Sequence, residues 1–144
     1  RLARALQTLG LQEGDRVGTF GWNSQRHFEL YYAVPCSGMV LHTLNIRLFA
    51  EQIEYIVENA DDQVIFVDDT LTGLLAPLAD RMTGVRHFVV MGDGDDGGLP
   101  NVLRYSRDRY LSNDWTDGCI ALSNEDMLEV WLLTQSNTPI LIEP

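Results

Sequence analysis

The sequence predicts an α/β fold in which helices cover a mostly parallel sheet. Helical and strand-like segments alternate four times within residues 1–91, an order typical of parallel strands joined by right-handed crossovers. The third strand-like segment, residues 63–68, is nearly all apolar, as expected for a strand that helices cover on both sides. The order of the elements and the composition of one central strand therefore indicate the architecture.

The first helix and the first strand follow from local patterns. Apolar residues recur at spacings of three and four over residues 1–9, and Gly10 ends the helix. The chain begins at Arg1, already inside this apolar stripe, which suggests a truncated N-terminus. After a turn at 13–15, the run at 16–22 is rich in Val, Thr and aromatic residues and predicts a buried strand.

The second helix is bounded by a cap and by two residues that interrupt helices. Asn23 or Ser24 can cap its start, and Pro35 and Gly38 end it. Three aromatic residues share one of its faces: Phe28, Tyr31 and Tyr32.

The remaining elements up to residue 91 continue the alternation. Strands are predicted at 39–44, 63–68 and 85–91. Two helices lie between them, with apolar faces formed by Ile53, Ile56, Val57 and Ala60 in one and by Leu71, Leu74, Leu75 and Leu78 in the other.

The regular pattern stops at Gly92. Residues 92–98 read as a flexible acidic loop, and residues 99–118 are polar and aperiodic. Ser123 and Asp126 form a capping-box pattern before residues 127–133, which fit a helix or a buried strand equally well. The last ten residues, 135–144, are predicted to form an unpaired tail.

Composition excludes several function classes. The 144 residues suggest one domain, and the net charge of −11 argues against nucleic acid and anionic membranes as partners. No apolar run is long enough to span a membrane. All ten basic residues are Arg, so a Walker-type phosphate lysine is absent. Cys36 and Cys119 lack metal-ligand spacing and are interpreted as reduced packing residues of a cytoplasmic protein.

Two motif matches in the acidic loop are rejected. Gly92, Gly94 and Gly97 match G-x-G-x-x-G, but the intervening Asp residues would repel a pyrophosphate and no helix opens afterwards. A solvated turn is the preferred interpretation. An EF-hand loop that starts at Asp93 would need Glu at position 104, which is Arg104.

Asp68 and Asp69 form an acidic pair at the carboxyl end of a predicted strand. Open parallel sheets bind ligands at this end, and such a pair can hold Mg²⁺, as in a phosphoacceptor domain. A phosphoacceptor would also need a lysine, which the chain lacks. The favoured alternative is that the pair caps the helix that begins near Leu71.

No histidine has a second ligand at metal-binding spacing, and no nucleophilic triad is recognisable. His27 is placed on a polar helix face, and His42 is expected to be a hydrogen-bonded interior or edge residue of a strand, although it could line a cleft; the third histidine is His87. Trp22, Asn23, His42 and Asn45 lie at or near strand ends, where capping and packing are favoured over ligand or subunit contact. Asn45 is expected to set the turn into the next helix.

Several segments together resemble the N-terminal part of the adenylate-forming acyl-CoA synthetases, in particular fatty-acyl-CoA ligases of the medium- and long-chain type. The resemblance is good over residues 1–91 and loose over residues 99–122, where 99–105 looks like a poorly ordered link. The strongest segment is VLHTLNIRL at 40–48. The others are residues 2–11, GDRV at 14–17, WN at 22–23, RH at 26–27, YAVP at 32–35, EQI at 51–53, YI at 55–56, residues 64–68 and VRHFVVM at 85–91.

The resemblance implies a two-step reaction in the parent enzyme. A carboxylate attacks ATP in the presence of Mg²⁺ to give an acyl-adenylate, and CoA then displaces AMP. The family uses a Ser/Thr/Gly-rich loop that ends in Pro-Lys-Gly, whereas residues 133–140 read LTQSNTPI, with neither Gly nor Lys. We therefore assign no catalytic, cofactor-binding or metal residue to this chain, although the resemblance implies ATP, Mg²⁺ and CoA for the full-length parent.

The resulting hypothesis divides the chain into three parts. Residues 1–91 form the α/β subdomain, residues 92–122 an acidic loop and irregular link, and residues 123–144 a helix or strand with a tail. The chain is interpreted as an N-terminal fragment of a cytoplasmic fatty-acid–CoA ligase that is inactive alone. Its partners would be the rest of the synthetase and a second copy in a homodimer. The alternatives are a stand-alone interaction or dimerisation module and, less favoured, a Mg²⁺-dependent phosphoacceptor using Asp68 and Asp69.

Overall fold

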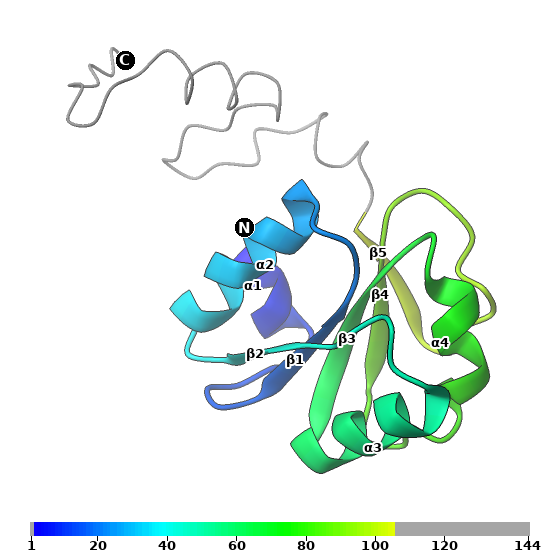
Figure 1. The fold of residues 1–144 in the computed structure, drawn as a ribbon. Coiled ribbons are helices and arrows are strands. Elements are labelled where there is room, and N and C mark those ends of the chain that lie inside the picture. The colour runs from blue at the N-terminus through cyan, green and yellow to red at the C-terminus, as the bar shows by residue number, and fades with distance from the viewer. Residues whose placement is uncertain (1, 106–144) are drawn as a thin grey trace, which may run out of the picture.

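The computed structural model describes residues 2–105, which form a five-stranded parallel sheet with the strand order β2-β1-β3-β4-β5 (Figure 1). The strands are β1 (Arg16–Phe20), β2 (Val40–Thr43), β3 (Asp62–Asp68), β4 (His87–Met91) and β5 (Val102–Tyr105). The helices are α1 (Leu2–Thr8), α2 (Gln25–Cys36), α3 (Ala50–Ala60) and α4 (Thr72–Ala79). The predicted parallel α/β fold is confirmed.

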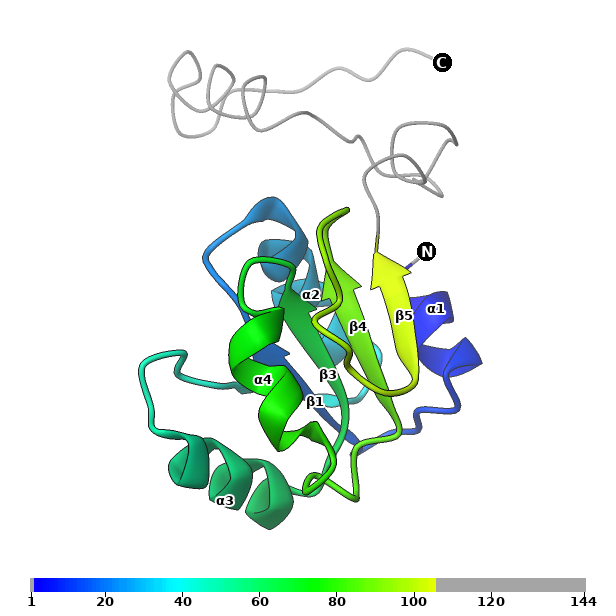
Figure 2. The ribbon, with the colours of Figure 1, turned by 90° about the vertical axis from the view of Figure 1, so that its right-hand side faces the viewer.

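Helices cover both faces of the sheet (Figures 1 and 2). Side chains alternate along β3, so that Val64 and Phe66 join the core under α1 and α2, whereas Ile65 and Val67 join the core under α3 and α4. These four residues are at most 2% exposed. The alternation explains why residues 63–68 read as a continuous apolar run, because both faces of this strand are buried.

Local hydrogen bonds set the helix starts. The Ser24 hydroxyl accepts from the amide of His27 at 3.3 Å, which confirms a cap at the predicted start of α2. The amide of Arg47 donates to Asn45 Oδ1 at 3.0 Å, which confirms that Asn45 sets the turn before α3. At the start of α3, the amide of Phe49 donates to Gln52 Oε1 at 3.1 Å.

One strand lies in a segment that was expected to be irregular. β5 pairs with β4 from Phe88↔Val102 to Met91↔Tyr105, within the stretch interpreted as a poorly ordered link. It spans four residues, and Leu103 and Arg104 in its middle are exposed. A short edge strand with a polar residue in it lacks the apolar run that marked β3, and the sequence pattern therefore missed it.

The face of α2 that packs on the sheet differs from its aromatic face. His27, Leu30 and Val34 are the buried residues of α2. Placing His27 on a polar face was wrong, because the residue is only 5% exposed. Its Nε2 lies 3.0 Å from Thr19 Oγ1 and its Nδ1 3.0 Å from the carbonyl oxygen of Trp22. Phe28, Tyr31 and Tyr32 point outward.

Two further expectations concern the cysteines and the C-terminal part. Cys36 is a free thiol exposed at the end of α2, so its interpretation as a packing residue was wrong. Cys119, the capping-box segment at 123–133 and the tail at 135–144 lie outside the described residues. Over residues 2–105, no helix has the length and apolar character needed to cross a membrane.

Candidate functional site

The strand order defines one place where a ligand site is expected. In the strand order, the chain moves from β1 outward to β2 in one direction and from β3 outward to β4 in the opposite direction. The direction of winding therefore changes between the adjacent strands β1 and β3. Open α/β sheets bind ligands at the carboxyl ends of the strands that flank such a switch point. Trp22 follows β1 at this edge, and Asp68 and Asp69 lie at the end of β3.

Side chains bridge the switch point directly. Trp22 Nε1 donates to Thr70 Oγ1 at 3.1 Å, and the Thr70 hydroxyl donates to Asp68 Oδ1 at 2.6 Å. The Thr70 amide donates to the same carboxylate oxygen at 3.1 Å. The indole is half exposed, at 51%, so the edge presents an aromatic ring whose polar atom is already bonded within the chain.

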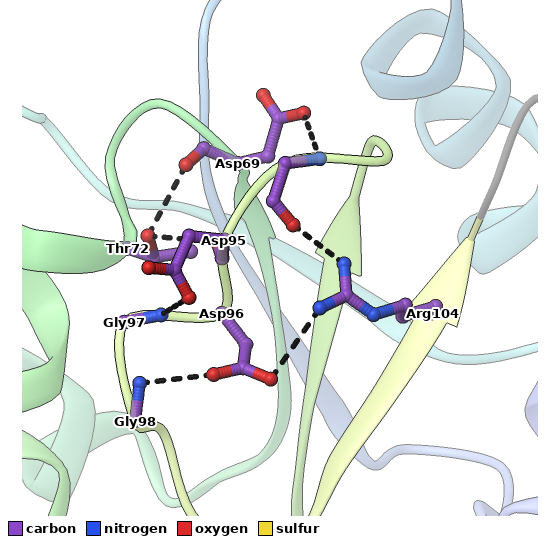
Figure 3. Close-up of polar contacts among 8 residues, drawn as sticks. Asp69, Thr72, Asp95, Asp96, Gly97, Gly98 and Arg104 are labelled. Atoms are coloured by element: carbon purple, nitrogen blue, oxygen red, sulfur yellow. Dashed lines mark hydrogen bonds and ion pairs between the residues drawn. The ribbon is translucent and has the colours of Figure 1, made fainter.

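Asp69 fastens the acidic loop, residues 92–98, to the end of β3 (Figure 3). Its Oδ2 accepts from the amide of Gly94 at 2.9 Å. A Cβ atom at Gly92 would lie 2.0 Å from Asp69 Oδ2, and the φ of Gly92 is +148°. Position 92 therefore requires glycine, because the loop backbone passes directly over the Asp69 carboxylate.

The loop amides that could bind a phosphate are occupied by the chain's own carboxylates. Besides the Gly94 amide on Asp69, the Gly97 amide donates to Asp95 Oδ1 at 3.1 Å and the Gly98 amide to Asp96 Oδ1 at 3.0 Å (Figure 3). Phosphate-binding loops leave such amides free to point at the anion. This geometry gives a physical reason to reject the G-x-G-x-x-G match, and the residues present do not fit the phosphates of ATP.

Arg104 on β5 closes the acidic loop from the other side. Its Nη1 donates to the carbonyl oxygen of Gly94 at 2.7 Å, and its Nη2 lies 3.4 Å from Asp96 Oδ2 (Figure 3). Position 104, where an EF-hand would have its closing Glu, is thus a positively charged Arg that bonds to the loop. In the described part of the chain, no three His, Cys, Asp or Glu side chains are grouped to hold a metal ion.

The interpretation of the acidic pair as a helix cap was wrong. α4 begins at Thr72 with Leu71 as its N-cap, and no side chain accepts a capping hydrogen bond there. Asp68 instead closes a turn with Thr70, and Asp69 holds the acidic loop. Both carboxylates already have donors, and nothing in this arrangement favours the phosphoacceptor hypothesis.

A second polar pair lies on the α3/α4 face of the sheet. His42 Nδ1 on β2 lies 3.0 and 2.8 Å from the two carboxylate oxygens of Asp62, the first residue of β3. β1 runs between these two strands, and the pair reaches across it above Gly18. A Cβ at Gly18 would lie 3.2 Å from Asp62 Oδ2, so glycine is what leaves room for the pair.

Burial dominates the electrostatics of this pair. The Asp62 side chain has no exposed surface, and the His42 side chain is 26% exposed. Burial raises the pKa of Asp62 above its ordinary value, while the hydrogen bond and charge of His42 and the charge of Arg16 oppose the rise. The expected hydrogen-bonded state of His42 is confirmed. The sequence analysis did not identify Asp62. The only sequence signal for it was Gly18, because a glycine inside a strand indicates that another group packs closely over it.

The strand-end residues named from the sequence do not form one constellation. His42 pairs with the start of β3, whereas Trp22 pairs with Thr70 beyond its end. Asn45 serves its own turn, and Asn23 is exposed beside Trp22. His87, at the start of β4, is partly buried. These residues therefore make separate local contacts and do not form one catalytic cluster in the described part of the chain.

Comparison with known proteins gives the family of this fold. The sequence profile of a family described as AMP-binding enzyme matches residues 1–111, more than half of the chain. The chain belongs to the AMP-binding enzyme family. The acyl-CoA synthetase resemblance of the sequence is thereby confirmed, and the matching part of these relatives is their N-terminal part.

Two relatives show how much of an AMP-binding enzyme the chain represents. It is 47% identical over 102 residues to a 3-methylmercaptopropionyl-CoA ligase of Ruegeria lacuscaerulensis, covering 71% of this chain and 19% of the ligase. It is 41% identical over 108 residues to a medium-chain-fatty-acid–CoA ligase of Ectopseudomonas oleovorans, covering 73% and 20%. The chain therefore spans about a fifth of the length of these curated relatives.

A solved structure shows the same fold. The coronafacic acid ligase of Pectobacterium brasiliense superimposes with a TM-score of 0.66 at 17% identity, over 83% of this chain and 24% of that one. At this identity the likeness establishes the fold of the AMP-binding enzymes and nothing about the substrate.

Proposed function

We propose that this chain is the N-terminal α/β part of an ATP-dependent ligase that joins a fatty acid, or a related carboxylic acid, to coenzyme A. The observation that carries the proposal is its identity of 47% and 41% to two CoA ligases of which it covers about a fifth. ATP, Mg²⁺ and CoA are then required by the complete polypeptide. Its location is proposed to be cytoplasmic.

We further propose that the chain does not catalyse alone. Stabilising charge on a reacting phosphate needs preorganised donors or cations. At the carboxyl edge the loop amides donate to Asp69, Asp95 and Asp96, and the chain contains no Lys. The described residues thus supply a scaffold, with residues 1–91 as its main part and β5 extending the sheet.

An assay of the purified 144-residue chain tests this inactivity. The chain is incubated with ATP, Mg²⁺, CoA and octanoate, and AMP is quantified by chromatography. We expect no AMP above a protein-free control, with the intact Ectopseudomonas oleovorans ligase as the positive control. Octanoate-dependent AMP formation by the chain would overturn the proposal of inactivity.

Reading the gene beyond the codon for Pro144 tests the fragment proposal independently. A frame that continues into a Gly-rich, Lys-containing loop supports the ligase proposal. A stop codon at that point, together with a folded product, contradicts it and favours a stand-alone module.

The second candidate function is an interaction or dimerisation module, and the outward-facing aromatic residues of α2 favour it. Size-exclusion chromatography with light scattering tests the module. A monomer would contradict a dimerisation module, whereas a homodimer agrees with both candidates, and the reading frame beyond Pro144 then decides between them.

A further inference from the structure

A row of exposed apolar residues runs along one side of α2. We call it the aromatic stripe; it consists of Phe28, Tyr31, Tyr32, Pro35 and Cys36. The three rings are 60%, 47% and 60% exposed. The rings of Phe28 and Tyr32 already contact each other edge to face, with centroids 5.0 Å apart. The stripe therefore exposes contiguous apolar surface rather than isolated rings.

The spacing of the stripe is that of a buried helix face. Positions 28, 31, 32, 35 and 36 recur at intervals of three and four, the period that marks a packed helix surface. A separate side of α2, with Leu30 and Val34, already packs on the sheet. A helix with two apolar sides is typical of a helix that is covered twice, and only one of these sides is covered by residues 2–105.

The other large exposed ring on a helix has a different setting. Tyr55 on α3 is 67% exposed, but Glu51 and Glu58 are exposed on the same helix, and Glu54 pairs with Arg81 at 2.8 Å. A single ring among carboxylates is ordinary protein surface. The contrast makes Tyr55 a matched control for the stripe.

We propose that the aromatic stripe is the surface on which the downstream part of the same polypeptide packs. This inference rests on the proposed function, in which the chain is the first fifth of a longer ligase. About four fifths of the length of the relatives has no counterpart in the chain and must pack against this domain somewhere. The stripe offers five exposed, uncharged side chains on one side of a single helix for such packing.

The position of the last described strand supports this occupant. β5 ends at Tyr105, whose hydroxyl donates to the carboxylate of Glu29 on α2. Tyr105 also packs on the core that α1 and α2 share. The last described strand therefore ends beside α2, the helix that carries the stripe.

Charge favours contact at this surface as well. The chain carries a net charge of −11, which opposes close approach of another acidic surface. The five residues of the stripe carry no charged group, so a partner surface can cover them without bringing carboxylates together.

A chimera tests the proposal. Residues 1–111 replace the matching N-terminal fifth of the Ectopseudomonas oleovorans ligase, and Phe28→Ser, Tyr32→Ser and the control Tyr55→Ser are compared in the chimera and in the 144-residue chain. In the chain alone we expect Tyr55→Ser to leave the melting temperature unchanged and the two stripe variants to lower it only slightly, through loss of the Phe28–Tyr32 ring contact. In the chimera we expect Phe28→Ser and Tyr32→Ser to lower it by at least about 2 °C more than in the chain alone, and Tyr55→Ser to leave it unchanged.

Each other outcome has a defined meaning. Stripe variants that lower the melting temperature no more in the chimera than in the chain alone would show that nothing covers the stripe. A 144-residue chain that is a dimer and becomes a monomer with Tyr32→Ser would show that a second copy is the occupant, and it would overturn the proposal. An unmodified chimera that does not fold also counts against it. A folded chimera without ligase activity contradicts the proposed function instead, while the melting temperatures still decide the packing of the stripe.

Discussion

Some close contacts of this domain depend on a single residue, and Gly18 is the clearest example. It lies under the His42–Asp62 pair in the middle of β1, where the absence of a side chain lets groups on β2 and β3 meet across a strand. The pair therefore ties the edge strand β2 to a central strand that is not its neighbour.

Gly18→Ala is expected to lower the free energy of unfolding by about 1–3 kcal/mol, the usual cost of overpacking a core. The added Cβ would lie 3.0 Å from Ile65 Cγ1 and 3.2 Å from Asp62 Oδ2. Urea denaturation measures the change. The matched control is Gly73→Ala in α4, where a Cβ meets nothing within 4 Å and stability should stay the same or rise slightly. Equal stabilities of the two variants would contradict this account of Gly18.

The buried carboxyl of Asp62 makes a prediction about pH. Burial raises its pKa above the ordinary value of 3.8, against the opposing influence of His42 and Arg16 and with a smaller contribution from the charge of Asp61. The folded chain therefore binds this proton more tightly than the unfolded chain does. The stabilising contribution of the protonated Asp62 carboxyl is complete below pH 3.8 and is lost as pH rises through the folded-state pKa.

Asp62→Asn removes this titration. We expect the stability of the original chain relative to Asp62→Asn to fall as pH rises from about 4 to about 8, because only the original chain must ionise a buried carboxyl. Urea denaturation at a series of pH values gives the difference directly. A difference that grows with pH would show that pairing with His42 outweighs the cost of burial.

At the scale of elements, the alternation of helix and strand identified every described element up to residue 91. The central strand β3 was recognisable as a continuous apolar run, because both of its faces are buried. The edge strand β5 does not, because exposed residues fill its middle and only its pairing with β4 makes it a strand. In α2, periodicity revealed an apolar face but could not tell which of two such faces packs on the sheet.

The candidate site was predictable in place but not in detail. The carboxyl edge followed from a parallel sheet, and the Asp residues near it were visible in the sequence. Their partners were not, because Asp69 bonds to Gly94 across 25 positions. Asp62, at the opposite end of β3, was missed for the same reason, because it bonds to His42 across 20 positions. Contacts of such separation depend on the strand order, which local patterns do not contain.

The acidic loop is held by a few hydrogen bonds, and removing one should free it locally. Asp69→Ala leaves the Gly94 amide without its acceptor, so hydrogen exchange in residues 92–98 should become roughly fivefold faster, as expected for a net contribution of about 1 kcal/mol. Asp93→Ala, in the same loop, is the control and should leave exchange unchanged. Mass spectrometry of peptides from this loop measures the effect, and equal exchange in both variants would contradict the role given to Asp69.

The whole molecule combines an acidic surface with a sheet whose carboxyl edge is closed by its own side chains. In the loop at this edge, the carboxylates of Asp69, Asp95 and Asp96 satisfy the amides of Gly94, Gly97 and Gly98. The same groups that would repel a phosphate thus stabilise the loop. This arrangement supports the proposal that the described residues act as a scaffold.

The charge balance also predicts how the chain responds to salt. With 21 acidic and 10 basic residues, the folded state brings like charges closer together than the unfolded state does, and this repulsion lowers stability. Salt at about 0.1 M screens charges beyond about 10 Å and should raise the free energy of unfolding by up to about 1 kcal/mol. Thermal unfolding in NaCl and in KCl measures the effect, which should be the same for both salts because screening depends on ionic strength. A fall in stability on adding salt would mean that attractive pairs such as Arg81–Glu54 and Arg86–Asp15 outweigh the net repulsion.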